Sequence, residues 1–250
     1  MSFTESEVAT PRNVKKDIIL SIKYPLIFVA ALWIIKLVEI YFEISFKTFG
    51  VFPRHTSGLA GIIFSPLIHG DLSHLMSNTF PVIILGSMLV YFYKSLAPEV
   101  YLLGWIISGF WLWILGREAY HIGASGLIYC MASFLFVSGI LRRHRGLMAV
   151  SLVVTFLYGG IIWGVFPIKE QMSWEGHLTG LVAGFVLAFF YKKKGPQRKL
   201  YSWELEDEDD EFEKFEEYYK DYLERKKNSK DDSKDEEPPP FKYTYKEKDD

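Results

Sequence analysis

The sequence has 250 residues, of which 50% are hydrophobic and 23% charged, with a net charge of −2. These averages hide a division near residue 200, because the first part carries 18 basic and 10 acidic residues, whereas the last fifty residues carry 10 basic and 20 acidic ones. From residue 60 to residue 191 only 11 of 132 residues are charged, against about a quarter in a soluble domain, so the composition argues against a soluble enzyme.

Six apolar stretches approach the ~20 residues that cross the hydrocarbon of a bilayer. The first, Tyr24–Phe42, includes Lys36 and Glu39, which lie toward one end and can extend to the interface. The other five contain no Asp, Glu, Lys or Arg: Leu75–Tyr93, Val100–Gly116, Ile122–Leu141, Gly146–Ile168 and His177–Tyr191. We therefore predict an all-α, polytopic membrane protein with six transmembrane helices, the first of which is a retained anchor.

Two segments outside these stretches have their own character. Residues 43–69 mix glycine and proline with large apolar side chains, which predicts short helical turns packed on the helices or in the interface. Residues 192–250 are too charged to bury a core, and we predict a mostly disordered tail. Four aromatic residues in this tail repeat at helical spacing and leave open a short amphipathic helix that docks a partner: Phe212, Phe215, Tyr219 and Tyr222.

The positions of lysine and arginine predict the topology. With six spans, thirteen of the basic residues near the spans fall on the side that holds both termini, and four fall on the other side. Positive charge accumulates in the cytoplasm, so both termini are predicted to be cytoplasmic. The expected organisation is a cytoplasmic segment over residues 1–23, a multi-pass core in the cell membrane over 24–191 and a cytoplasmic tail over 192–250.

Four of the six histidines lie at the outer ends of predicted spans: His69, His74, His121 and His177. Polar groups in such places are costly and need a reason. A zinc site is disfavoured, because His69 and His74 are five residues apart and no Glu lies between them. The single cysteine, Cys130, gives no disulfide or thiol pair. We predict no metal and no cofactor.

A serine begins the fourth predicted helix. Ser125 is flanked by Gly123, Ala124 and Gly126, small residues that let backbone or substrate approach closely. A serine that only serves helix packing is the alternative. At a helix start, however, free backbone N–H groups can stabilise a developing oxyanion, which favours a nucleophile.

A histidine begins the sixth predicted helix in the same way. His177 shares one face with Gly180 and Gly184, and this glycine face allows close packing against a neighbour. If that neighbour is the helix of Ser125, the His177 Nε2 atom can reach the serine oxygen and act as general base and then general acid. The alternative is a hydrogen-bonded core histidine without a catalytic role.

A third group of polar residues surrounds the start of the second predicted helix. His74 and Asn78 are four residues apart on one face, and two side-chain donors aimed at one point suit the oxyanion of acyl transfer. His69 and Asp71 precede this helix, where capping the helix or holding the loop is the expected role.

Taken together, these three segments resemble the rhomboid family of intramembrane serine proteases. They follow the order, spacing and helices of that family over about residues 58–191. The resemblance implies that Ser125 is the nucleophile and His177 its base, and that His74 and Asn78 line the oxyanion hole. It further implies that Tyr129 stacks on the His177 ring and that His69 holds the first loop.

The resemblance also implies the partners. The expected substrates are single-span transmembrane proteins, which enter from the membrane lipid beside the fifth span, and no nucleic acid is expected. The alternative is a non-catalytic rhomboid-like protein that binds and escorts membrane clients. Members of that kind typically lack the serine or the histidine, and both are present here.

Overall fold

The computed structural model describes residues 14–168, 172–198 and 208–228. In these residues the protein is all-helical, with no strand and one isolated bridge between Val51 and His121. This confirms the predicted all-α class. The α-helices in the described residues are α1 Val14–Tyr41, α2 Gly61–Phe64, α3 Leu72–Phe92, α4 Ala97–Leu115, α5 Ser125–Leu141, α6 Arg145–Tyr158, α7 Trp174–Phe190 and α8 Glu208–Asn228.

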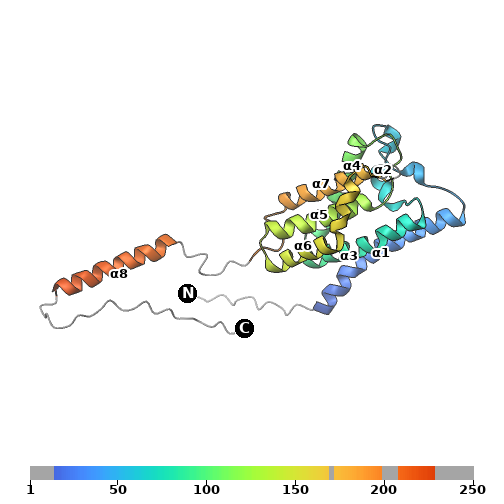
Figure 1. Cartoon of the computed structure of the whole chain (residues 1–250). Helices are drawn as coiled ribbons and strands as arrows, with labels where there is room; N and C mark the ends of the chain where they lie inside the picture. The colour runs from blue at the N-terminus through green and yellow to red at the C-terminus, as the bar shows by residue number, and fades with distance from the viewer. Residues whose placement is uncertain (1–13, 169–171, 199–207, 229–250) are drawn as a thin grey trace, which may run out of the picture. The chain divides into compact units, whose positions relative to one another are not determined.

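The chain divides into two compact units, Met1–Arg198 and Lys199–Asp250. In the first unit α5 packs against α3, α4, α6 and α7, and α1 packs along α3 (Figure 1). The contact between α5 and α7 is so close that a Cβ atom at Gly180 would overlap the carbonyl oxygen of Gly126, and one at Gly184 would overlap that of Cys130. The glycine face of α7 therefore lies directly on the backbone of α5.

The segment between α1 and α3 forms short helical turns at the end of the bundle where α4 ends and α5 and α7 begin. Besides α2 it contains three 3₁₀-helices: η1 Lys47–Phe49, η2 Thr56–Gly58 and η3 Ser65–Leu67. The indole nitrogens of Trp105 and Trp113 hold it on α4 by donating to the carbonyl oxygens of Ile62 and His55, at 2.9 Å each. The predicted short helical turns are present.

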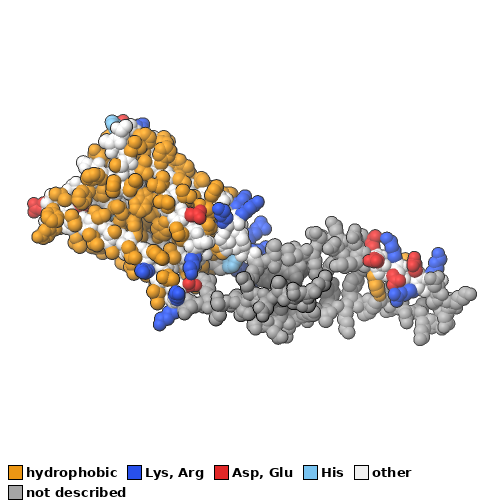
Figure 2. Space-filling model, turned by 180° about the vertical axis from the view of Figure 1, so that it is seen from behind, with side chains coloured by type: hydrophobic (Ala, Val, Ile, Leu, Met, Phe, Trp, Pro, Cys, Tyr) orange, Lys and Arg blue, Asp and Glu red, His pale blue; other side chains and the backbone are white. Residues whose placement is uncertain are grey.

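The surface of the first unit suits lipid. Three helices, α1, α3 and α4, are long and apolar enough to cross a membrane, and the apolar helices α5, α6 and α7 have 17, 14 and 17 residues. Large side chains such as Phe156, 90% exposed, and Phe190, 70% exposed, point outward. Hydrophobic side chains cover the flank of the unit in Figure 2. This is a membrane protein.

Two helices differ by more than three residues from the apolar stretches that predict them. α1 begins at Val14 rather than Tyr24, because apolarity marks the hydrocarbon and a helix can continue into water. The stretch Gly146–Ile168 is not one helix: α6 ends at Tyr158, and the 3₁₀-helix η4 covers Gly159–Val165. Gly159 and Gly160 start η4, and glycine is the residue that most weakens a helix interior apart from proline.

The second unit contains α8, the conformation that the aromatic spacing of the tail leaves open. Tyr218 and Tyr219 on this helix are 50% and 46% exposed. The predictions for residues 199–207 and 229–250 lie outside the described residues, as does that for residues 1–13.

Candidate active site

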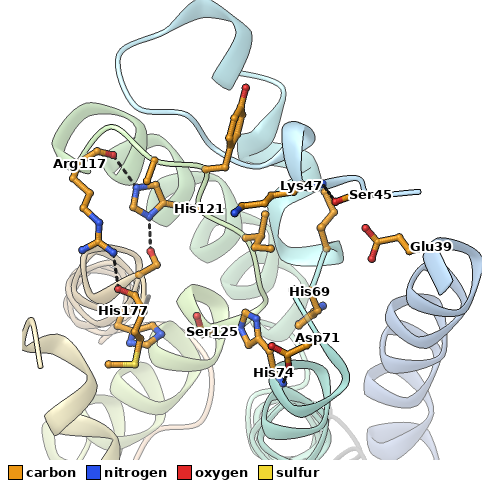
Figure 3. Close-up of a pocket in the computed structure, with 17 residues that line it drawn as sticks. Glu39, Ser45, Lys47, His69, Asp71, His74, Arg117, His121, Ser125 and His177 are labelled. Carbon is orange, nitrogen blue, oxygen red and sulfur yellow. Dashed lines mark hydrogen bonds between the residues drawn. The ribbon is translucent and has the colours of Figure 1, made fainter. Parts of the chain in front are cut away.

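A cavity of about 1000 Å³ lies where α3, α5 and α7 begin. Four of the predicted site residues line it together: His69, His74, Ser125 and His177. Figure 3 shows these side chains around the same space, although they come from three separate parts of the sequence. Asn78 and Tyr129 do not belong to the cavity lining.

Ser125 is the first residue of α5, as expected, so its backbone N–H has no partner within the helix. The turn before it is fixed at Gly123, whose N–H donates to the Ser65 carbonyl at 2.8 Å and whose φ is +109°. A Cβ atom there would lie 2.7 Å from two atoms of the His74 ring. Glycine is therefore required at position 123, and the His74 ring lies against the turn that leads into Ser125.

His177 has a defined tautomer. Its Nδ1 atom lies 2.8 Å from the Gly164 carbonyl oxygen of η4, and because a carbonyl only accepts, Nδ1 must carry the proton. In the neutral ring Nε2 is then an unprotonated acceptor. The Tyr129 ring stacks on the His177 ring, with the centroids 4.3 Å apart and the planes 9° apart. Both contacts restrict the orientation of the His177 ring.

The described residues include no hydrogen bond between Ser125 and His177, although both side chains line the cavity. Hydrogen bonds of this kind are often long in free enzymes and shorten when substrate binds. The side chains of Ser125 and His177 thus line one cavity without a hydrogen bond between them.

His69 links the first loop to the start of α5. Its buried ring accepts, through Nε2, from the backbone N–H of Ala124 at 3.4 Å, and burial lowers the pKa of His69 to about 3, so the ring is neutral at physiological pH. Lys36 donates to the carbonyls of His69 and Gly70 at 3.0 Å each and pairs with Glu39 at 3.1 Å. Both residues hold this loop from α1, since the Glu39 carboxylate also accepts from the Phe46 N–H at 2.7 Å. That their side chains extend to the membrane interface stays a prediction.

The start of α3 is capped as expected. The Asp71 carboxylate accepts from the His74 backbone N–H at 2.7 Å, and this bond lowers the pKa of Asp71. Asn78 is buried and donates through Nδ2 to the His74 carbonyl of its own helix, at 2.7 Å. Its side chain is therefore turned to the helix backbone, and a role in the oxyanion hole stays a prediction.

Sequence reasoning missed a second polar group at the rim of the cavity. His121 contacts Ser173 through Nδ1 at 2.7 Å and the Arg117 carbonyl through Nε2 at 3.0 Å, while Arg117 pairs with Glu175 at 3.3 Å. The pKa of His121 is lowered from its usual value, mainly because burial disfavours the charged ring. The available signal was spacing: His121 lies four residues before Ser125, and Ser173 lies four residues before His177.

Comparisons with known proteins identify the family of this chain. The family model of the Rhomboid domain matches residues 56–194, more than half of the chain. An uncharacterized protein of Mycobacterium tuberculosis is 38% identical over 183 residues, which cover 70% of this chain and 75% of the relative. An uncharacterized protein of Mycobacterium leprae is 34% identical over 70% of this chain and 72% of its own length.

A more distant relative carries a family name. It is a protein of Acanthamoeba polyphaga mimivirus named as a rhomboid protein, 27% identical over 128 residues, which cover 49% of this chain and 70% of the relative. The family match spans α3 to α7 and so includes α3, α5 and α7, whose first turns line the cavity. The chain therefore belongs to the rhomboid family.

Proposed function

We propose that this protein is an intramembrane serine endopeptidase that cleaves the transmembrane segments of single-span membrane proteins. The observation that carries the proposal is the arrangement of Ser125 and His177: a serine at the first residue of a helix and a histidine with an unprotonated Nε2 line the same cavity. A serine that served only helix packing would have no need of a polar cavity in front of it.

In the proposed reaction, His177 Nε2 takes the proton of the Ser125 hydroxyl as the serine oxygen attacks the carbonyl carbon of the substrate. The protonated His177 then gives this proton to the leaving amine, and the peptide bond breaks to leave an acyl-enzyme. A water molecule attacks the acyl group with His177 again as base, which releases the acid product and restores Ser125. The Gly164 carbonyl stabilises the imidazolium through Nδ1–H.

The oxyanion of each tetrahedral intermediate needs donors near Ser125. The Ser125 backbone N–H is available at the start of α5, and the His74 ring lies against the turn before it. We propose these two groups as the main donors. Asn78 can contribute only through the second hydrogen of its Nδ2 atom, because the first is used by the His74 carbonyl.

Replacing His74 by alanine should lower kcat by about 10- to 10³-fold with a smaller change in KM, because the oxyanion forms only after attack. Asn78→Ala should cost less, since its amide is turned to the helix backbone. Steady-state kinetics with a model single-span substrate measures both effects. His55→Ala, which removes an imidazole away from the cavity, is the matched control. Wild-type kcat in the His74→Ala, Asn78→Ala double variant would remove both residues from the oxyanion hole.

We further propose six transmembrane helices with both termini in the cytoplasm, supported by the apolar surfaces of α1 and α3–α7 and by the uneven distribution of lysine and arginine. A protease added to the cytoplasmic face of sealed vesicles should remove the tail beyond residue 199 and leave the membrane core. Removal of the tail only from the opposite face would reverse the topology.

A fluorophosphonate probe tests the proposed activity, because it reacts only with an activated serine. The purified wild-type protein should be labelled, and mass spectrometry should place the adduct on Ser125. The Ser125→Ala variant should remain unlabelled. An unlabelled wild-type protein that also fails to cleave single-span substrates would favour the alternative, a non-catalytic protein that escorts membrane clients.

A further inference from the structure

The two catalytic helices are approached by segments that contact each other. Residues 116–124 lead from α4 into Ser125, and Met172 and Ser173 lead into α7 and His177. His121 and Ser173 join these segments, with the His121 Nδ1 atom 2.7 Å from the Ser173 hydroxyl oxygen. Both residues line the same cavity as Ser125 and His177, and Figure 3 labels His121 there.

The direction of this hydrogen bond follows from the other contacts of the two side chains. The Nε2 atom of His121 lies 3.0 Å from the Arg117 carbonyl oxygen and must donate to it, so Nδ1 is the acceptor in the neutral ring. The Ser173 hydroxyl therefore donates to Nδ1. The Ser173 oxygen also accepts from the Gly176 N–H at 3.3 Å as the N-cap of α7. His121 thus has the opposite tautomer to His177.

The His121–Ser173 pair is anchored on both sides. The backbone of His121 exchanges two hydrogen bonds with Val51, at 2.9 and 2.8 Å. These bonds tie His121 to the first outer loop, which is the segment between α1 and α3. A second link runs parallel to the pair: Arg117 pairs with Glu175 at 3.3 Å and donates to the Met172 carbonyl at 2.9 Å. His121 as a whole residue is only 3% exposed, so this connection has little freedom to rearrange.

Ser125 and His177 lie between two contacts that hold the starts of α5 and α7 together. On one side is the His121–Ser173 pair. On the other side is the backbone contact of Gly126 with Gly180. In the sequence Ser125 lies between His121 and Gly126, and His177 lies between Ser173 and Gly180. A displacement of about 1 Å between a nucleophile and its base can cost on the order of 10²-fold in rate.

We propose that His121 and Ser173 are positioning residues of the site, which hold the first turns of α5 and α7 at the separation that proton transfer from Ser125 to His177 requires. The inference rests on the proposed protease function. It assigns the first outer loop a part in the reaction, because Val51 holds His121 in place. The pair adds a hydrogen bond just before the first turns of α5 and α7, beside the backbone contacts of Gly126 with Gly176 and Gly180.

The test compares variants that break or keep the hydrogen bond. His121→Leu and Ser173→Ala should each slow fluorophosphonate labelling of Ser125 and lower kcat by about 10- to 100-fold, with a smaller change in KM. Their combination should cost less than the sum of the two losses, because both variants remove the bond between His121 and Ser173, and each removes one further bond of its own. His121→Asn, which keeps an acceptor near the Nδ1 position, and Ser173→Thr, which keeps the hydroxyl, should retain most of the rate.

Ser133→Ala is the matched control, because the Ser133 hydroxyl donates to the Leu181 carbonyl at 2.8 Å and so joins α5 and α7 far from the cavity. The fluorophosphonate probe should label Ser125 in the Ser133→Ala variant at the wild-type rate. Two results would overturn this inference and leave the protease function standing. One is a Ser173→Ala variant that labels and cleaves as fast as an active wild type, and the other is a loss of rate in Ser133→Ala equal to that in Ser173→Ala. An adduct on Ser173 would replace the positioning role by a nucleophilic one. A wild type that neither labels nor cleaves would overturn the protease function and this inference with it.

Discussion

Replacing Ser125 by alanine should reduce cleavage of a model single-span substrate by on the order of 10³-fold or more, because no other group in the proposed reaction can form the acyl-enzyme. The variant should remain folded. Ser125 sits at the first residue of α5 and lines the cavity, so its hydroxyl is not part of the buried packing between helices. Turnover by purified protein in detergent, together with thermal unfolding, measures both expectations.

His177→Ala should be as severe as Ser125→Ala, and the double variant should be no worse than either, because in the proposed mechanism the two residues act as one unit. His177→Ala also removes the ring that stacks on Tyr129 and donates to Gly164, so some loss of thermal stability is expected in this variant alone. Substantial turnover by the purified Ser125→Ala protein would refute the assignment of the nucleophile. Independent, multiplying losses in the double variant would refute the shared role.

The features that the sequence predicts well depend on local pattern. The start of α5 at Ser125 and the cap of α3 at Asp71 follow from residue types at helix ends. The glycine face of α7 follows from spacing at 3.6 residues per turn, and the structure shows its partner to be α5. These features need no knowledge of which distant segments meet.

The features that the sequence does not predict depend on long-range contacts. Lys36 and Glu39 look like charges near a membrane surface, and only the packing of α1 beside the first loop shows that Lys36 donates to the His69 carbonyl. The ring of His121 forms a hydrogen bond with Ser173, which lies 52 residues away in the sequence. The break after Tyr158 was missed for a different reason: uniform apolarity concealed Gly159 and Gly160.

A large loss of stability is expected when the contact between α5 and α7 is disturbed. Gly180→Ala should destabilise the protein, because the new Cβ atom would overlap the Gly126 carbonyl oxygen, which belongs to the backbone and cannot rotate away. Overpacking of this kind typically costs about 1–3 kcal/mol. Alanine favours a helix interior over glycine by about 1 kcal/mol, so a net loss would show that the steric term is the larger one.

Gly160→Ala is the matched control for that substitution, since no atom lies within 4 Å of the position that its Cβ would take. The temperature of thermal unfolding in detergent should therefore be lower for Gly180→Ala and stay near the wild-type value for Gly160→Ala. Because Gly126 follows Ser125 directly, a shift of α7 away from α5 also moves His177 away from Ser125, the proposed nucleophile. Gly180→Ala should therefore lose turnover even at temperatures where it is folded. If Gly180→Ala instead unfolds at or above the wild-type temperature, the backbones of α5 and α7 are not in contact at this point, and the close approach that brings Ser125 and His177 to one cavity is wrong.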